Sequence, residues 1–203
     1  MKMKTLTMAV SAAVAAMSLQ AMADQGPSTT TAPYIQALAP GVEFTSILTT
    51  GDVIGGYKMG GIPDGLGAYD NDDGTFTVLM NHEIFANSSG PLGIARGHGA
   101  VGAYVSEWVI DKDSLEVVSG EDLMKSVYKK DATAGAWVRV PGTGTLGQTN
   151  AFARFCSADL ADRRAFFNNA TRKGTKQRIF LNGEESNPTY QRGLAHVATG
   201  KDK

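Results

Sequence analysis

The sequence predicts an all-β fold built from short antiparallel strands. Glycine supplies 24 of the 203 residues, a content that favours frequent turns over long helices. Two stretches have the form of a β-hairpin, with apolar or β-branched segments on both sides of a short polar turn. Hydrophobic residues make up 42% of the chain, which is an ordinary content for a globular core.

Two hairpins account for the centre of the predicted fold. The acidic turn Asp70–Gly74 joins the first pair of strands, and the polar loop Asp111–Ser114 joins the second. A calcium loop at Asp70 is not favoured, because its glycine is fifth rather than sixth and its twelfth residue is Asn81. The expected strands are Val42–Thr50, Ile62–Tyr69, Thr75–Met80, Ala103–Ile110, Leu115–Ser119, Trp137–Val140, Arg178–Leu181 and Ala195–Thr199.

One main helix is expected at Ser157–Lys173. Ser157 is a good N-cap residue, and Gly174 can end the helix. A helix starting there would place Cys156 at its positive dipole end, where the pKa of a thiol is lowered. The residues that would share one face are Leu160, Ala161, Ala165, Phe166 and Ala170.

Residues 1–23 are predicted to be a secretory signal peptide. Lys2 and Lys4 precede the apolar run Met8–Leu19, and Ala21–Ala23 matches the small-residue cleavage pattern. The run is shorter than the roughly 20 residues that a membrane-spanning helix needs. We therefore expect cleavage after Ala23, a periplasmic or extracellular protein, and no membrane span.

The charge balance argues against nucleic acid as a partner. The formal net charge is −1 and the sequence pI is about 6.3, so no strong basic field exists. The glycine-rich stretch Gly51–Gly61 is not followed by the GK[ST] of a phosphate-binding loop, and we expect a flexible loop there. Composition leaves the oligomeric state open.

Cys156 is the single cysteine, and an exported protein normally uses cysteines in pairs. It is therefore either buried and inert or held by a metal ion. Carboxylates follow two apolar segments, since Glu83 comes after one predicted strand and Glu184 and Glu185 come after another. A thiolate with carboxylates makes a metal-ligand set of mixed softness. The candidate ligands are thus Glu83, Cys156, Glu184 and Glu185.

The segments Asp64–Glu83 (DGLGAYDNDDGTFTVLMNHE), RFCSADL, NGEE and AHVATG resemble the PhoX-type alkaline phosphatases, which are secreted β-propeller enzymes. The resemblance implies a phosphomonoesterase that uses iron and calcium and acts on a small phosphate ester. It also implies that Cys156, Glu83, Glu184 and Glu185 belong to the metal cluster, with His82 as a neighbour.

The family fold is larger than this chain, because a propeller blade takes about 40–45 residues. We expect residues 24–203 to form the N-terminal part of an incomplete propeller, with weak metal binding and little turnover. The predicted signal peptide has no twin-arginine pair, which the leaders of many relatives carry. The alternatives are a non-catalytic, secreted, calcium-binding propeller module and a phytase-like or lactonase-like propeller.

Overall fold

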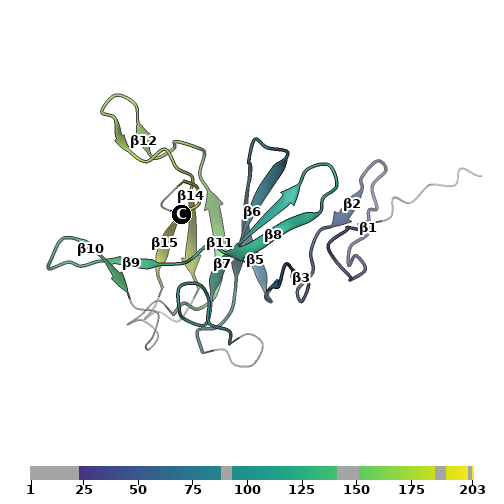
Figure 1. Cartoon of the computed structure of the whole chain (residues 1–203), viewed down its shortest axis with the longest axis horizontal. Helices are drawn as coiled ribbons and strands as arrows, with labels where there is room; N and C mark the ends of the chain where they lie inside the picture. The colour runs from purple at the N-terminus through teal and green to yellow at the C-terminus, as the bar shows by residue number, and fades with distance from the viewer. Residues whose placement is uncertain (1–22, 88–92, 141–150, 186–190, 201–202) are drawn as a thin grey trace, which may run out of the picture.

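The computed structural model describes residues 23–87, 93–140, 151–185, 191–200 and 203. This part of the chain contains fifteen strands and no helix, so the all-β prediction is confirmed. The proposed signal peptide lies outside the described residues except for Ala23. The strands form several small sheets, of which two make up the body of the molecule (Figure 1).

The first sheet is an antiparallel meander of four strands in the order β5-β6-β7-β8. Both predicted hairpins lie in it, and both are confirmed. In the acidic turn, Asp72 and Gly74 have φ values of 62° and 92°, and Asp70 and Asp73 accept hydrogen bonds from backbone N–H groups of the turn. The strands are β5 (Pro63–Asp70), β6 (Thr75–His82), β7 (Tyr104–Asp111) and β8 (Val117–Asp122).

The second sheet is also antiparallel and has the order β11-β14-β15. Figure 1 shows it beside the first sheet in the centre of the molecule. Strands were predicted from sequence at both β14 and β15, whereas β11 was not. The bounds are Phe155–Leu160 for β11, Ile179–Glu184 for β14 and Gly193–Val197 for β15.

Four two-stranded pairs complete the fold, and two of them extend as arms from the second sheet (Figure 1). The arms are the β9–β10 and β12–β13 pairs. The remaining strands are β1 (Ala23–Gln25) parallel to β2 (Phe44–Ser46), β3 (Val53–Ile54) with β4 (Tyr57–Lys58), β9 (Val127–Lys130) with β10 (Trp137–Val140), and β12 (Phe167–Asn168) with β13 (Lys173–Gly174).

The predicted helix at Ser157–Lys173 is wrong. Its first residues form β11, in which exposed Ser157 and Asp159 alternate with Ala158 and Leu160, which pack against the core. That period of two matches a half-buried strand. Pairing with β14 outweighs helix propensity, which is a weak preference. The capping signals were therefore misread, because Ser and Asp also suit the exposed positions of a strand beside a turn.

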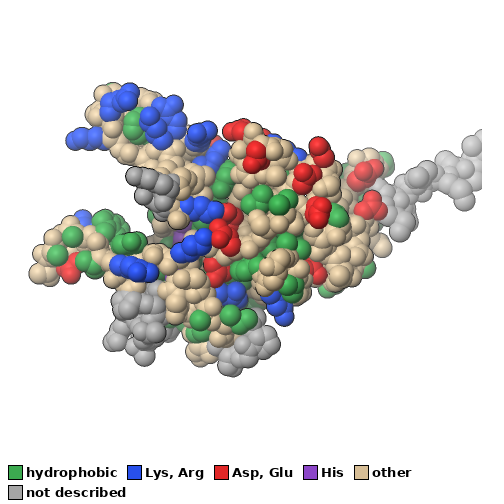
Figure 2. Space-filling view, viewed as in Figure 1, with side chains coloured by type: hydrophobic (Ala, Val, Ile, Leu, Met, Phe, Trp, Pro, Cys, Tyr) green, Lys and Arg blue, Asp and Glu red, His purple; other side chains and the backbone are tan. Residues whose placement is uncertain are grey.

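The rest of the predicted helix is the β12–β13 arm. The Asn168 side chain accepts hydrogen bonds from the N–H groups of Ala170 and Thr171, so it stabilises a turn where a helix was expected. Arg164 and Arg172 have left-handed φ values of 72° and 59°. Figure 2 shows a concentration of Lys and Arg side chains over this arm. Its basic residues are Arg163, Arg164, Arg172, Lys173 and Lys176.

The main hydrophobic core joins the two sheets. Leu79 and Tyr104 of the first sheet share one buried cluster with Phe155 and Phe180 of the second. Burial of such side chains contributes about 25 cal/mol per Å² of apolar surface. The two sheets therefore fold as one body.

Glycines on β5 allow β11 to approach it closely. A Cβ atom at Gly65 would overlap the carbonyl oxygen of Cys156 and lie 2.7 Å from the Cβ of Ala158. At Gly67 it would lie 2.6 Å from the Cβ of Leu160. The absence of side chains at these two positions fixes the height of β11, and of Cys156, above β5.

A buried network of side-chain hydrogen bonds holds β11 from the other side. Asn81 donates to the carbonyl oxygens of Cys156 (2.9 Å) and Ser157 (3.2 Å). The Asn182 amide donates to the Asn81 oxygen (2.9 Å), and His196 Nε2 donates to the Asn182 oxygen (2.9 Å). An amide side chain both donates and accepts hydrogen bonds, so Asn81 and Asn182 connect the strands β6, β11, β14 and β15. The network thereby satisfies polar groups that are buried.

We predict that Gly65→Ala lowers the free energy of unfolding by about 1–3 kcal/mol, the usual effect of overpacking a core. Gly193→Ala on β15 is the matched control, since a Cβ there meets nothing within 4 Å. Urea unfolding of both variants measures the difference. Equal stabilities would contradict the close contact between β5 and β11.

We also predict that His196 makes stability depend on pH. Burial lowers the pKa of His196 to about 4, below the 6.5 that is usual for a histidine. Between these values the unfolded chain holds a proton that the folded protein does not, so stability falls as pH drops from 6.5 towards 4. His196→Gln should reduce this slope by up to about 1.4 kcal/mol per pH unit. Urea unfolding at pH 7 and pH 5 tests it, and an unchanged slope would refute the assignment.

Candidate metal centre

Three of the four candidate ligands come together at one end of the sheets. The Cys156 Sγ atom lies 3.1 Å from Oε1 of Glu83 and 2.7 Å from Oε2 of Glu185. Glu83 directly follows β6, Cys156 is the second residue of β11, and Glu185 directly follows β14. Residues about 70 and 100 positions apart in the sequence thus share one site because of how β6, β11 and β14 end.

Asp64 adds a third carboxylate to the cluster. Ligand atoms of Asp64, Glu83 and Cys156 lie within 4.8 Å of one another. Asp64 sits at a register shift in β5, just beyond the Pro63–His82 pair. Sequence reasoning missed this residue. Counting outward from the acidic turn would have placed position 64 beside the end of β6, because hairpin register follows from the turn.

Arg154 binds both acids and was also missed. Its Nε donates to Glu83 (2.7 Å), its Nη2 pairs with the same carboxylate, and that Nη2 lies 3.0 Å from Glu185 Oε2. Its backbone N–H donates to the Ile84 carbonyl, and its own carbonyl accepts from Glu185 N–H. Arg154 adopts a left-handed φ of 50°, which is costly for a residue with a Cβ. The sequence signal was an arginine within an otherwise apolar run, AFARFC.

The cluster carries more negative charge than its own cation balances. The cluster has three carboxylates, those of Asp64, Glu83 and Glu185, and the guanidinium of Arg154 pairs with two of them, Glu83 and Glu185. A neutral thiol has one hydrogen, so Cys156 can donate to only one of the two acids at a time. The second carboxylate then faces the sulfur without a proton between them. A cation at this position would relieve that repulsion.

The expected lowering of the Cys156 pKa is wrong, because no helix begins there. Burial raises the pKa of the thiol above its ordinary range, and the carboxylates of Glu185 and Glu83 raise it further. The hydrogen bond from Cys156, together with Arg154, holds the pKa of Glu83 below its usual value. The protein alone therefore keeps a proton on sulfur, and a bound cation would reverse that preference.

Glu184 does not join the cluster. Its buried carboxylate accepts two hydrogen bonds from Arg192, at 2.6 and 2.7 Å, and a third from the Ala153 N–H at 2.7 Å. Both carboxylate oxygens of Glu184 thus accept hydrogen bonds from neighbouring protein groups, in a bidentate ion pair with Arg192. Side chains alternate along a strand, so the two adjacent glutamates at the end of β14 have separate environments.

His82 lies in the core beside the site. Its Nδ1 donates to the Gly61 carbonyl (3.3 Å), its Nε2 accepts from the Ser106 hydroxyl (2.8 Å), and its ring stacks on Tyr104. Burial lowers the pKa of His82 to about 4, so the ring is neutral near pH 7. Both ring nitrogens are occupied, and His82 remains a neighbour of the site, as the sequence predicted.

Comparisons with protein-family models, with curated proteins and with solved structures found no match for this chain. No helix among the described residues is long and apolar enough to cross a membrane. A function therefore has to be inferred from the geometry and chemistry of the cluster.

The two neighbouring glutamates should respond differently to substitution. Glu184→Gln removes one partner of a buried ion pair and should lower the free energy of unfolding by about 3 kcal/mol. Glu185→Gln changes an exposed side chain and should alter it by less than about 0.5 kcal/mol. Urea unfolding measures both, and equal losses would contradict the assignment of Glu184 to the scaffold.

Proposed function

We propose that this chain is an exported, metal-dependent phosphatase of the PhoX type, acting on phosphomonoesters. The observation that supports it is the thiol of Cys156 lying between the carboxylates of Glu83 and Glu185, with Asp64 within ligand reach. The family resemblance implies metal ligation by a thiolate and carboxylates, and the side chains of Cys156, Glu83 and Glu185 lie close enough together to act in that way.

The donor atoms fit the two proposed metals. A thiolate is a soft ligand that suits iron, and carboxylate oxygens suit both iron and calcium. Cys156, Glu83 and Glu185 would hold the iron, and Asp64 would supply an oxygen ligand for calcium. Bound cations would neutralise the charge of a phosphate ester and lower the pKa of a coordinated water.

Arg154 is the residue of this chain placed to bind the substrate. Its side chain is about a third exposed (35%) although it pairs with two glutamates. A guanidinium has five N–H donors in a planar fork, so Arg154 can stay paired with Glu83 and Glu185 and still donate a hydrogen bond to a phosphate oxygen. The ester would then be oriented by Arg154 at the open side of the cluster.

The fold is compatible with the wider proposal. A four-stranded antiparallel meander is the composition of a propeller blade, and β5–β8 is such a unit packed against a second sheet. We propose that residues 24–203 are part of an incomplete propeller. We also propose export to the periplasm or the outside, with cleavage after Ala23.

The decisive experiment is iron binding by Cys156→Ala. Protein reconstituted anaerobically with Fe²⁺ should lose at least about tenfold in iron affinity when the thiol is removed, because the thiolate is the only soft ligand in the set. Ser157→Ala, at the adjacent exposed position of β11, is the matched control and should bind as the wild type does. Circular dichroism should show the same β content in all three proteins.

Hydrolysis of a generic phosphomonoester by the reconstituted protein separates the alternatives. Turnover, however slow, that needs iron and is lost in Cys156→Ala supports a phosphatase. Calcium binding without iron binding or hydrolysis would instead favour the non-catalytic calcium-binding module. Iron affinity unchanged by Cys156→Ala would reject the proposed centre altogether.

A further inference from the structure

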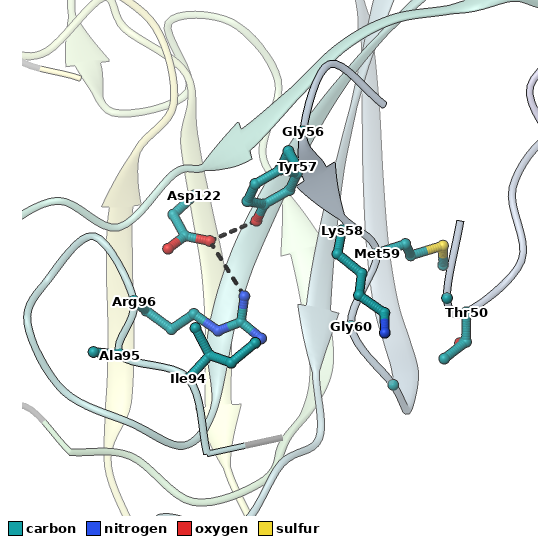
Figure 3. A pocket seen from close by; sticks show the side chains of 12 residues that line it. Thr50, Gly56, Tyr57, Lys58, Met59, Gly60, Ile94, Ala95, Arg96 and Asp122 are labelled. Atoms are coloured by element: carbon teal, nitrogen blue, oxygen red, sulfur yellow. Dashed lines mark hydrogen bonds and ion pairs between the residues drawn. The ribbon is translucent and has the colours of Figure 1, made fainter. Parts of the chain in front are cut away.

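A pocket that none of the cysteine cluster's residues lines lies beside the β3–β4 hairpin. It has a volume of about 470 Å³ and is formed by the β3–β4 hairpin, the segment 94–96 and the end of β8 (Figure 3). The glycine-rich stretch Gly51–Gly61, predicted to be a flexible loop, thus contains two short paired strands, and β4 lines the pocket. The side chains used below are Tyr57, Lys58, Met59, Ile94, Arg96 and Asp122.

Arg96 is the fixed cation of this pocket. Its side chain is only 7% exposed, and its guanidinium carbon lies 3.7 Å from the centre of the Tyr104 ring. Gly60 faces both groups: a Cβ there would overlap the Tyr104 hydroxyl and lie 3.2 Å from Arg96 Nη2. Stacking on an aromatic face holds a guanidinium flat while leaving its N–H groups free to donate.

The nearby acid does not satisfy Arg96. Asp122 lies 4.0 Å from Arg96 Nη1, which is too far for a hydrogen bond. Its Oδ1 accepts from the Tyr57 hydroxyl (2.5 Å), and its Oδ2 accepts from the Gly97 N–H (2.6 Å). Among the described residues, the buried Nε of Arg96 has no hydrogen-bond partner. A buried charged donor left in this state is costly, and a ligand oxygen would remove the cost.

Lys58 supplies a second cation at the pocket. Its side chain is exposed, and it forms no ion pair with another described residue. Figure 3 shows Lys58 on the opposite side of Arg96 from Asp122. With Lys58 and Arg96 against one carboxylate, the lining has a formal charge of +1. Ile94 is exposed and gives it an apolar wall, whereas the Met59 side chain is buried in the core with Trp108.

We propose that this pocket binds a small organic anion, whose carboxylate or phosphate group pairs with Arg96 and Lys58 and whose apolar body lies against Ile94. Arginine matches such oxyanions with two parallel hydrogen bonds. None of the cluster residues Asp64, Glu83, Cys156 and Glu185 lines this pocket, so the proposal does not depend on the proposed phosphatase.

Calorimetric titration with benzoate, phenyl phosphate and neutral benzyl alcohol tests the site, in buffer containing a chelator. We expect saturable binding of at least one anion and none of the alcohol. Lys58→Ala should weaken anion binding about tenfold, the value of one charge-assisted hydrogen bond. Arg96→Gln should abolish it, and Lys130→Ala, another exposed lysine, should leave it unchanged.

The two anions identify the preferred charged group, since the tighter of them shows whether carboxylate or phosphate is selected. Cys156→Ala should bind the anion as the wild type does, which separates this pocket from the metal centre even if iron binding fails. Arg96 is buried, so Arg96→Gln can prevent folding. In that case binding by Lys58→Ala decides the test. No saturable binding of either anion, or equal binding by Lys58→Ala and the wild type, would overturn the proposal.

Discussion

The position of β11 over the β5–β6 hairpin is the constraint on which the site depends. Gly65 and Gly67 let the strand come into contact with β5, and Asn81 captures the carbonyl oxygens of Cys156 and Ser157. Since Asn81 is two residues from Glu83, one short segment of β6 both holds the cysteine's backbone and supplies a carboxylate to its sulfur. The candidate metal ligands are therefore aligned by buried backbone contacts rather than by surface loops.

Arg154, two residues before Cys156 and directly before β11, completes this alignment. Its backbone forms hydrogen bonds with Ile84 and Glu185, and its guanidinium pairs with Glu83 and Glu185. Arg154 therefore joins the segment after β6 to the residue after β14. The left-handed φ of Arg154 is the local strain that this arrangement requires. Glu184 supports it from the buried side, since its carboxylate also holds the Ala153 N–H next to Arg154.

Local patterns in the sequence were sufficient for the hairpins, because turn chemistry is encoded over a few residues. The meeting of Cys156 with Glu83 and Glu185 was expected from the unpaired cysteine, the acids at strand ends and the family resemblance, although the helix expected after Cys156 is absent. Local patterns were not sufficient for β11, whose Ser157 and Asp159 satisfy helix-capping rules equally well until pairing with β14 is known. Asp64 and Arg154 were missed because their roles follow from register and from long-range contact. Glu184 was assigned with Glu185, although the alternation of a strand separates such neighbours.

Extended X-ray absorption at the iron edge of the reconstituted protein tests the central claim most directly, since it reports which atoms surround the metal. The account predicts one sulfur scatterer per iron, with oxygen in the remaining positions, and loss of the sulfur signal in Cys156→Ala. Iron bound in an environment of oxygen and nitrogen alone, with Cys156 present and reduced, would contradict it.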